Sequence, residues 1–505
     1  MNRCVAADRV CQGYTDVFVS TQVFSAQYAR DQINGVLGLH TPPRIPSPAP
    51  GEARALQYYQ VNVAGIIGGA VDPEFWTTSV LQLSEAEPAI KQALIALSDL
   101  WEVQADHDIF DAGDAQRRHF KKYSKALTAT AHRVAQPRAD TVALTTCVLF
   151  LCLHCLRGDK EETYKLLRTG AAVMQKVLRE LYDPSVTTQN ETAKIFLPIF
   201  ERMLVLLRLF GGRLPHFRSS DALLYQNLSA TFSHFDTLDE ARGALYWLVA
   251  ESHELITNTR LYRFSEQAND LDEAAVLNCV QKQAVQLAAY TAWLEAYRSL
   301  CGAIAVKAAA DESYTANLVL THTITVLWLS TCMERDEVAW DEHTDSFRIV
   351  VREARKLVST NTLGAAPFTF EMCVIPPLYL TVLKCRDSQV RQQALSVLEQ
   401  APAKEGLWNR AEVLRVCRRV VQLESGSGQA TPDGVFFEGA RIVDTRTLRT
   451  TERGTEVQFA AKLNGHLELW KEWDEVIPLE EGAASGIRST YTNIYTSGRS
   501  VMLVP

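Results

Sequence analysis

Several short groups of residues have the types and spacing that catalysis or metal binding could use. His253 and Glu254 begin like the helix of a zinc protease. The second histidine of that motif would fall at Thr257, so the metal would lose a ligand. Cys152 and Cys155 could form a redox or metal pair, but they lie in an apolar helical run without a second ligand pair at zinc-site spacing. We therefore interpret them as buried core cysteines.

Two acidic segments also have residue types that could bind a metal or transfer protons. The aspartates at 106, 108, 111 and 114 resemble a calcium loop in composition, but the central glycine is missing and Arg117 stands where the bidentate glutamate belongs. Residues 341–345 combine carboxylates with His343 in a polar turn that has no nucleophile nearby in sequence. Neither a phosphate-binding loop nor a dinucleotide fingerprint occurs. The sequence thus predicts that the protein is not an enzyme.

The densest basic cluster covers residues 117–125. Such a cluster can serve nuclear import or nucleic-acid contact. The alternative, which we favour, is the polar face of a helix whose apolar stripe contains Phe120, Tyr123 and Leu127. The net charge of -8 means that the chain as a whole has no broad positive field for phosphate binding. Any contact with DNA is therefore expected to be local.

The cysteines and the apolar segments indicate the cellular environment of the protein. Most of the 11 cysteines sit in apolar helical patterns, which is typical of a reducing environment. The longest apolar run, residues 142–156, is shorter than the roughly 20 residues of a membrane span and is predicted to be a core helix. The first residues show no apolar segment of a secretory signal. No membrane partner is expected.

Helical periodicity dominates from residue 52 onward. A capping box is predicted from Ser84 to Glu87, with Pro88 in the first turn. Apolar residues then recur at helical spacing at 90, 93, 94, 97 and 101. Similar stripes run through positions 120, 123, 127, 131 and 134, and through 164, 167, 171, 174 and 178. Further helices are predicted over about 190–210, 238–257, 271–308, 313–334, 345–358, 388–400 and 408–424.

These patterns predict an all-α fold, a large irregular bundle of antiparallel helical pairs with a small β-hairpin extension at the C-terminus. The hairpin strands are expected at 435–443 and 456–462, and Trp470 and Trp473 are expected to anchor the tail onto the helices. The predicted segments are a short Cys-containing start at 1–13, a linker at 14–51 that is Pro-rich at 41–51, a helical domain at 52–425, and a loop, hairpin and tail at 426–505.

Blocks of residues along the chain resemble one family. The stretch from Arg3 to Tyr14 is similar to the closing third of the fungal binuclear zinc cluster, in which Cys, six residues, Cys and then Asp-Gly-Tyr is a frequent ending. Between about 52 and 424 the chain resembles the regulatory region that follows this finger in fungal transcription factors. The similar residues are Arg54, Leu56, Tyr58, Asp72, Phe75, Trp76, Leu167, Arg168, Gly170, Pro376, Pro377, Tyr379, Lys384, Arg386, Asp387, Glu405, Gly406 and Trp408.

The resemblance implies that segment 1–13 is a remnant of a zinc-cluster finger. In the family six cysteines hold two zinc ions, and only Cys4 and Cys11 carry over, as metal ligands in a longer chain with a complete finger. Two thiolates cannot hold two tetrahedral zinc ions. Zinc is therefore the cofactor of a complete form, and none is expected for this chain. We expect the missing Cys-x-x-Cys segment to be encoded upstream of the Met1 codon.

The resemblance also implies a function. It indicates a nuclear fungal regulator of RNA polymerase II transcription, with the helical domain as its regulatory region. DNA would be bound only through a complete finger, and the implied partners are the transcription machinery or regulatory proteins and a small-molecule effector. The chain as it stands is expected not to bind DNA specifically. The alternative is a finger-less helical scaffold that binds protein partners or a small effector.

Overall fold

The computed structural model describes residues 50–68, 72–105, 112–181, 191–209, 232–264, 273–305, 312–359, 366–371, 373–426, 441–462, 470–479 and 486–488. All of them belong to one unit, residues 46–505. Cys4, Cys11, the linker up to residue 49 and the aspartates at 106, 108 and 111 lie outside these residues. The predictions for those positions remain predictions.

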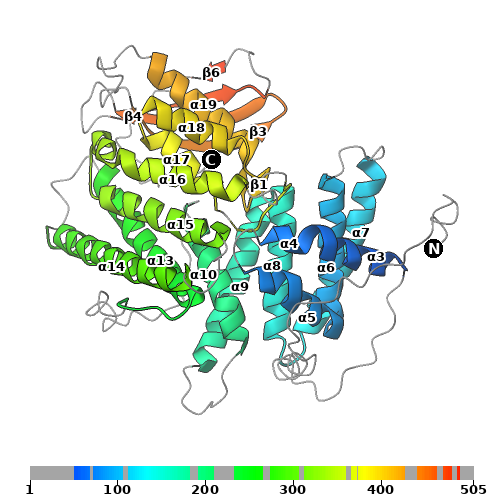
Figure 1. Cartoon of the computed structure of the whole chain (residues 1–505). Coiled ribbons are helices and arrows are strands. Elements are labelled where there is room, and N and C mark those ends of the chain that lie inside the picture. The colour runs from blue at the N-terminus through cyan, green and yellow to red at the C-terminus, as the bar shows by residue number, and fades with distance from the viewer. Residues whose placement is uncertain are drawn as a thin grey trace, which may run out of the picture. The chain divides into compact units, whose positions relative to one another are not determined.

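The first half of the described chain is a group of antiparallel helices, drawn in colours from blue to blue-green in Figure 1. Short elements come first: α3 (Pro50–Tyr58), the π-helical turn η1 (Tyr59–Val63), α4 (Ala64–Ile67), a second π-helical turn η2 (Phe75–Ser79) and α5 (Val80–Ala86). Longer helices follow: α6 (Pro88–Ala105), α7 (Ala112–Val134), α8 (Asp140–Arg157), α9 (Lys160–Leu181) and α10 (Glu191–Leu209). Helix α6 packs on α7 and α8, and α9 packs on α8 and α10.

Helix α8 forms the centre of this group. By length and composition it could cross a membrane, but 83% of it is buried inside the protein. The prediction of a core helix is therefore confirmed. The helix ends at Gly158, whose φ of 74° is the left-handed conformation that glycine adopts without strain. Its backbone N–H donates to Cys155 O at 3.0 Å, which satisfies one of the last carbonyls of the helix.

The second half of the chain consists of further helices and a C-terminal sheet. The helices are α13 (Leu238–Phe264), α14 (Glu273–Ala305), α15 (Glu312–Thr331), the 3₁₀ turn η4 (Glu337–His343), α16 (Thr344–Ser359), α17 (Ile375–Lys384), α18 (Ser388–Leu398) and α19 (Arg410–Gly426). Trp293 lies at the centre of the core between α13, α14 and α15. Its ring stacks on Tyr297 at 4.8 Å and on His322 at 5.3 Å, and its indole N–H donates to Ala241 O at 2.8 Å.

Two antiparallel sheets complete the fold, so the predicted class of a helical bundle with a small C-terminal β extension is confirmed. Strands β1 (Lys404–Glu405) and β2 (Trp408–Asn409) form a short pair. Strands β3 (Ile442–Thr451), β4 (Gly454–Lys462), β5 (Trp470–Ile477) and β6 (Gly486–Arg488) form a sheet in that order, which α19 contacts. The prediction had a two-stranded hairpin whose first strand ran over 435–443, of which 435–440 lie outside the described residues.

The anchoring role predicted for Trp470 and Trp473 remains a prediction. Trp473 stacks on Phe459 of the neighbouring strand at 5.5 Å, so it packs within the sheet. The side chain of Trp470 lies outside the described residues. A contact between the sheet and the helices is made by Arg419 on α19, which pairs with the buried carboxylate of Glu475 at 2.7 Å. The tail is thus held to α19 in part by an ion pair, which the apolar pattern did not indicate.

The predicted capping box at Ser84 is wrong. Ser84 lies inside α5, where its hydroxyl donates to Leu81 O at 2.7 Å. Glu87 is the residue between α5 and α6, and its carboxylate accepts from Arg133 at 3.0 Å. Helix α6 instead begins at Pro88, whose fixed φ suits the first helical position and whose missing N–H is not needed there.

The apolar stripe predicted for α7 is also wrong. Phe120 is 63% exposed and Leu127 is 42% exposed. The face turned toward the protein is partly polar, because Lys122 pairs with Asp99 on α6 and Lys125 pairs with Glu52 at 2.8 Å. Two cations of the basic cluster are thereby engaged within the protein. His119 and Ala126 of α7 are buried, and Tyr123 packs edge to face on Phe150 of α8 at 5.7 Å.

Candidate functional site

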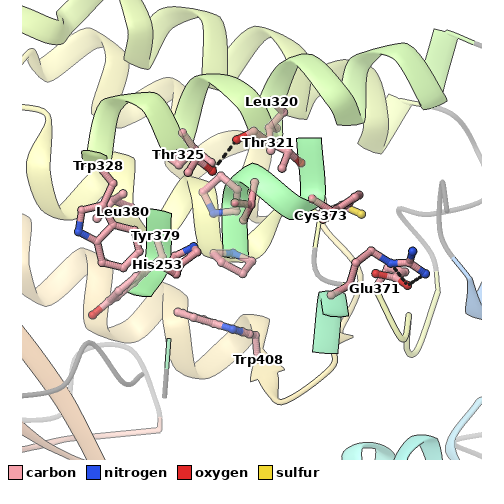
Figure 2. Close-up of a pocket in the computed structure, with 16 residues that line it drawn as sticks. His253, Leu320, Thr321, Thr325, Trp328, Glu371, Cys373, Tyr379, Leu380 and Trp408 are labelled. Atoms are coloured by element: carbon pink, nitrogen blue, oxygen red, sulfur yellow. Dashed lines mark hydrogen bonds and ion pairs between the residues drawn. The ribbon is translucent and has the colours of Figure 1, made fainter. Parts of the chain in front are cut away.

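A pocket lies where α13, α15 and α17 meet α10 and β2 (Figure 2). The space open to the centre of a water molecule measures about 100 Å³. A single water needs only about 10–15 Å³ of such space, so the pocket has room for several waters or one small organic molecule. Its lining is mostly aromatic and aliphatic: Arg202, Tyr246, Val249, His253, Leu320, Thr321, Ile324, Thr325, Trp328, Glu371, Cys373, Pro376, Pro377, Tyr379, Leu380 and Trp408.

Helix α15 forms one wall because several of its lining residues recur at helical spacing. Thr321, Thr325 and Trp328 fall on one face of the helix. The Thr325 hydroxyl donates to Thr321 O at 2.8 Å, so it is satisfied within the helix. Trp328 meets His253 of α13 edge to face at 5.3 Å. Figure 2 shows His253, Trp328 and Tyr379 gathered toward one end of the pocket.

Helix α17 forms another wall, and its start is fixed by a buried carboxylate. Pro376 and Pro377 occupy the first turn, where a missing N–H has no cost. Glu405 of β1 accepts hydrogen bonds from the backbone N–H of Val374 at 3.0 Å and of Ile375 at 2.7 Å. A negative charge at a helix N-terminus is stabilising. Burial nevertheless raises the pKa of Glu405 to about 7, against the effect of these N–H donors.

A cluster of four charged residues closes the other end, near Glu371 and Cys373 in Figure 2. Nε of Arg202 donates to Oε1 of Glu371 at 3.0 Å, and Arg202 also pairs with Asp72. Arg242 pairs with the second oxygen of Asp72 at 2.6 Å. Two guanidinium groups therefore face two carboxylates. Asp72 has a φ of 49°, a conformation that non-glycine residues adopt rarely and mostly at special sites.

Burial and the neighbouring charges have opposite effects on the pKa values of the groups in this cluster. Burial disfavours the charge of Arg202, but the carboxylates of Glu371 and Asp72 outweigh it and keep the pKa of Arg202 above its usual value. Burial raises the pKa of Glu371, and Arg202 offsets part of this effect. The guanidinium also lies over the ring of Tyr246, 5.5 Å from its centroid. Among the residues that the structure describes, Nη1 of Arg202 is buried and meets no hydrogen-bond acceptor.

The candidate catalytic and metal-binding residues identified from the sequence do not lie together in one site. Cys152 and Cys155 are buried in α8, and burial raises the pKa of Cys155 to about 12, so the thiol is protonated at neutral pH. His253 lies in the pocket wall, and the hydroxyl of Thr257 donates to its backbone oxygen at 2.7 Å. Within the described ranges, no group of three or more His, Cys, Asp or Glu residues could hold a metal ion. Cys4 and Cys11 lie outside those ranges.

The acidic turn at 341–345 has a structural contact. Both oxygens of Asp341 accept from the guanidinium of Arg441, at 2.9 and 2.6 Å. This bidentate pair joins η4 to the residue that precedes β3. Arg441 is almost fully buried, so the pair fixes the C-terminal sheet against the helices.

Sequence reasoning did not find the pocket, because its residues come from elements far apart in the chain. Arg202 and Glu371 are separated by 169 positions. The one available signal was the similarity of Pro376, Pro377 and Trp408 to the final block of the family pattern. That signal carried no information about which residues they face.

Comparison with known proteins adds one finding. Residues 54–229 match the family model described as "Fungal specific transcription factor domain". No curated protein and no solved structure matches the chain. The match begins within α3 and extends beyond α10, so it includes Asp72 and Arg202 of the charged cluster. It supports the regulatory-region part of the resemblance over residues 54–229, so this part of the chain is similar to the regulatory domain of fungal transcription factors.

Proposed function

We propose that the chain is the regulatory region of a fungal zinc-cluster transcription factor that acts in the nucleus and controls transcription by RNA polymerase II. The observation that carries the proposal is the match of residues 54–229 to the fungal transcription factor domain. The helical fold of the described residues beyond this match is compatible with a regulatory role.

The chain as it stands does not bind DNA specifically in this account. Its net charge is -8, so the chain as a whole has no broad positive field for binding phosphates. Cys4 and Cys11 serve as zinc ligands only in a longer chain that supplies a complete finger. Partners in the transcription machinery then receive the regulatory signal.

The second candidate is a finger-less helical scaffold that binds a small effector. The pocket bounded by α13, α15 and α17 favours this alternative over a scaffold that binds only proteins, because ligand sites are concave, mostly apolar and supplied with few polar groups. The two candidates differ in whether DNA is ever bound, and both place the effector in the same helical domain.

A tethering assay tests the regulatory role. The whole chain is fused to a heterologous DNA-binding domain and expressed in a fungal cell that carries a matching reporter gene. We expect reporter transcription to change several-fold, upward or downward, relative to the DNA-binding domain alone. A matched control fusion carries Leu153→Asp, which places a charge in the fully buried core of α8 and should abolish the effect by unfolding the domain.

The result that would count against the proposal is also specific. If the wild-type fusion is intact and occupies the reporter promoter, as measured by chromatin immunoprecipitation, but transcription equals that of the DNA-binding domain alone, the chain is not a transcriptional regulatory region. Equal activity of the wild-type and Leu153→Asp fusions would lead to the same conclusion.

A further inference from the structure

We propose that the outer side of helix α7 is a docking surface for another protein, from which it receives an amphipathic helix with an apolar face and acidic flanks. The surface consists of basic residues and of an apolar line beside them, which we call the outer stripe: Phe120, Leu127, Ala131 and Val134. A role of this contact in regulation rests on the proposed function. The docking itself does not.

The outer stripe is an apolar surface that faces solvent. Phe120, Leu127 and Val134 follow one another at intervals of seven residues, so they lie on one side of the helix. Their side chains are 63%, 42% and 41% exposed, and Ala131 between the last two is exposed as well. A single exposed apolar side chain is ordinary, whereas a continuous line of them marks an interaction surface.

Another side of α7 holds the helix in the fold. His119 and Ala126 are buried on that side, and α7 packs there on α6 and α8. Figure 1 shows α7 at the margin of the first group of helices. The protein's own core therefore uses one side of the helix and leaves the outer stripe for a different contact.

The spacing of the outer stripe suits a second helix. Its apolar residues recur every seven positions, and Ala131 follows Leu127 by four positions and precedes Val134 by three, which is the alternation found in paired helices. From Phe120 to Val134 the stripe extends over about 21 Å, at a rise of about 1.5 Å per residue. A partner helix of about four turns would cover it.

The charge beside the outer stripe determines the charge of the partner. Residues 117–134 include no Asp or Glu, and their Lys and Arg residues are Arg117, Arg118, Lys121, Lys122, Lys125 and Arg133. Lys122, Lys125 and Arg133 pair with carboxylates elsewhere in the protein. Arg118 and Lys121 are exposed. A helix with acidic residues beside its apolar face complements this surface, and complementary charges give specificity and speed association.

The opposite edge of the outer stripe has charges of both signs. Tyr123 lies at this edge, three residues after Phe120 and four before Leu127. The guanidinium of Arg157 lies over its ring, 5.9 Å from the centroid. Asp159 lies near the same tyrosine, since His154 is within 3.4 Å of the carboxylate and is hydrogen-bonded to the Tyr123 hydroxyl at 2.9 Å. The basic side is therefore the one that contains Lys121.

A second copy of the chain fits this surface less well. In an antiparallel pair centred on Leu127, Phe120 would meet Val134 of the second copy, which suits both side chains. By the same symmetry Lys121 would stand level with Arg133 of the second copy, and the two helices would bring together only basic side chains. Like charges placed across an interface are unfavourable.

Nucleic acid also fits the surface less well than an acidic helix. Phosphates would contact Arg118 and Lys121, because most contacts to nucleic acid are made by cations and polar groups to the backbone. Such a contact would leave Phe120 and Leu127 in water. An amphipathic acidic helix satisfies the apolar and the basic part of the surface together.

The test uses the purified full chain and three fluorescein-labelled peptides of three heptads each. The acidic peptide repeats Leu-Ala-Gln-Leu-Glu-Ala-Glu, so that glutamates flank an apolar face. The lysine peptide has Lys in place of every Glu, and the serine peptide has Ser in place of every Leu. Dissociation constants come from equilibrium titrations monitored by fluorescence anisotropy.

Matched variants locate the contact. Leu127→Asp interrupts the outer stripe, and Leu277→Asp makes the same change on α14, where the leucine is 58% exposed. Lys121→Glu reverses a charge beside the stripe, and Lys282→Glu does so at an exposed position of α14. Thermal unfolding followed by circular dichroism verifies that the variants are folded. If Leu127→Asp fails to fold, Phe120→Ser takes its place.

The acidic peptide should bind saturably to one site, at least about tenfold more tightly than the lysine and the serine peptides. Leu127→Asp should weaken this binding by about tenfold or more, and Leu277→Asp should leave it within about twofold. Lys121→Glu should weaken binding of the acidic peptide by about fivefold and strengthen binding of the lysine peptide, whereas Lys282→Glu should change either by less than about twofold.

The proposal is overturned if the acidic peptide does not bind saturably, if the lysine peptide binds the wild type as tightly, or if Leu127→Asp and Leu277→Asp bind the acidic peptide equally well. Analytical ultracentrifugation tests the second copy, and a dimer that Leu127→Asp dissociates would overturn the proposal in its favour. Binding to vesicles of phosphatidylcholine and phosphatidylserine that Leu127→Asp abolishes would overturn it in favour of a membrane. The tethered reporter is measured without these peptides, so its outcome judges the proposed function separately.

Discussion

Gly170 offers a sharp test of the packing between α8, α9 and α10. It lies on α9 without a side chain, and a methyl group added there would come within 2.7 Å of Sγ of Cys147 and of Cζ of Phe200. Normal contacts between such atoms are about 3.5–4.0 Å, so the neighbours would have to move by about 1 Å. Gly170→Ala therefore overfills a site that closes against Phe200, two residues before Arg202 on α10.

The expected change in the free energy of unfolding of Gly170→Ala follows from two opposing effects. Replacing glycine by alanine within a helix stabilises by about 0.8–1.0 kcal/mol. Overpacking a core typically costs about 1–3 kcal/mol. Gly243→Ala on α13 is the matched control, because an added methyl there meets nothing within 4 Å. The difference between the two variants cancels the helix propensity, and we expect Gly170→Ala to be less stable than Gly243→Ala by about 1–3 kcal/mol.

Urea unfolding monitored by circular dichroism measures this difference, provided that the slope with denaturant stays constant. A rescue experiment adds Phe200→Leu, which shortens the side chain that the methyl would meet. The cost of Gly170→Ala should fall in that background by about 1 kcal/mol, as a coupling between contacting residues. If Gly170→Ala stabilises the protein as much as Gly243→Ala, the close approach of α9 to α8 and α10 described above is refuted.

Three further predictions concern pH, DNA and zinc. Burial raises the pKa of Glu405 from 4.5 to about 7, so its contribution to stability is fully present below about pH 4.5 and is lost as the pH rises through about 7. The free energy of unfolding of the wild type relative to Glu405→Gln should therefore fall by about 3 kcal/mol between these pH values. Urea unfolding at several pH values measures this difference, and a difference that stays constant with pH would contradict the prediction. A gel-shift titration of the 505-residue chain at physiological salt should show no sequence-selective binding, and selective binding tighter than about micromolar would refute the account. Elemental analysis should find less than one zinc per chain, whereas two tightly held ions would mean that cysteines such as Cys147, Cys152 and Cys155 form a site.

Helices with a clear apolar face were predictable from the sequence. The helix predicted at 345–358 is α16 (Thr344–Ser359), with Phe347, Val350 and Leu357 buried on one side. The prediction succeeded because burial of an apolar stripe is a local property of the sequence. Helix α17 was not predicted, although Pro376 and Pro377 lie in its first turn, where proline is well tolerated.

Features that depend on polar pairing were not predictable. Lys122 and Lys125 of α7 pair with carboxylates of other helices, whereas Phe120 and Leu127, which the apolar spacing predicted to be buried, are exposed. The same limit applied to the pocket, since Arg202 meets its partners only when α10 packs beside residues distant in the chain. Sequence spacing carries no information about such pairs, which arise from tertiary packing.

The central claim, that the chain regulates transcription, is tested most directly in its own cells. The protein is depleted within minutes through an inducible degradation tag at its C-terminus, and nascent RNA is sequenced before and after depletion. The account predicts that synthesis of a defined set of RNA polymerase II transcripts changes at least twofold before secondary effects develop, with the tagged but undepleted strain unchanged. If depletion is complete and nascent transcription by RNA polymerase II stays the same under conditions in which the protein is present in the nucleus, the account is wrong.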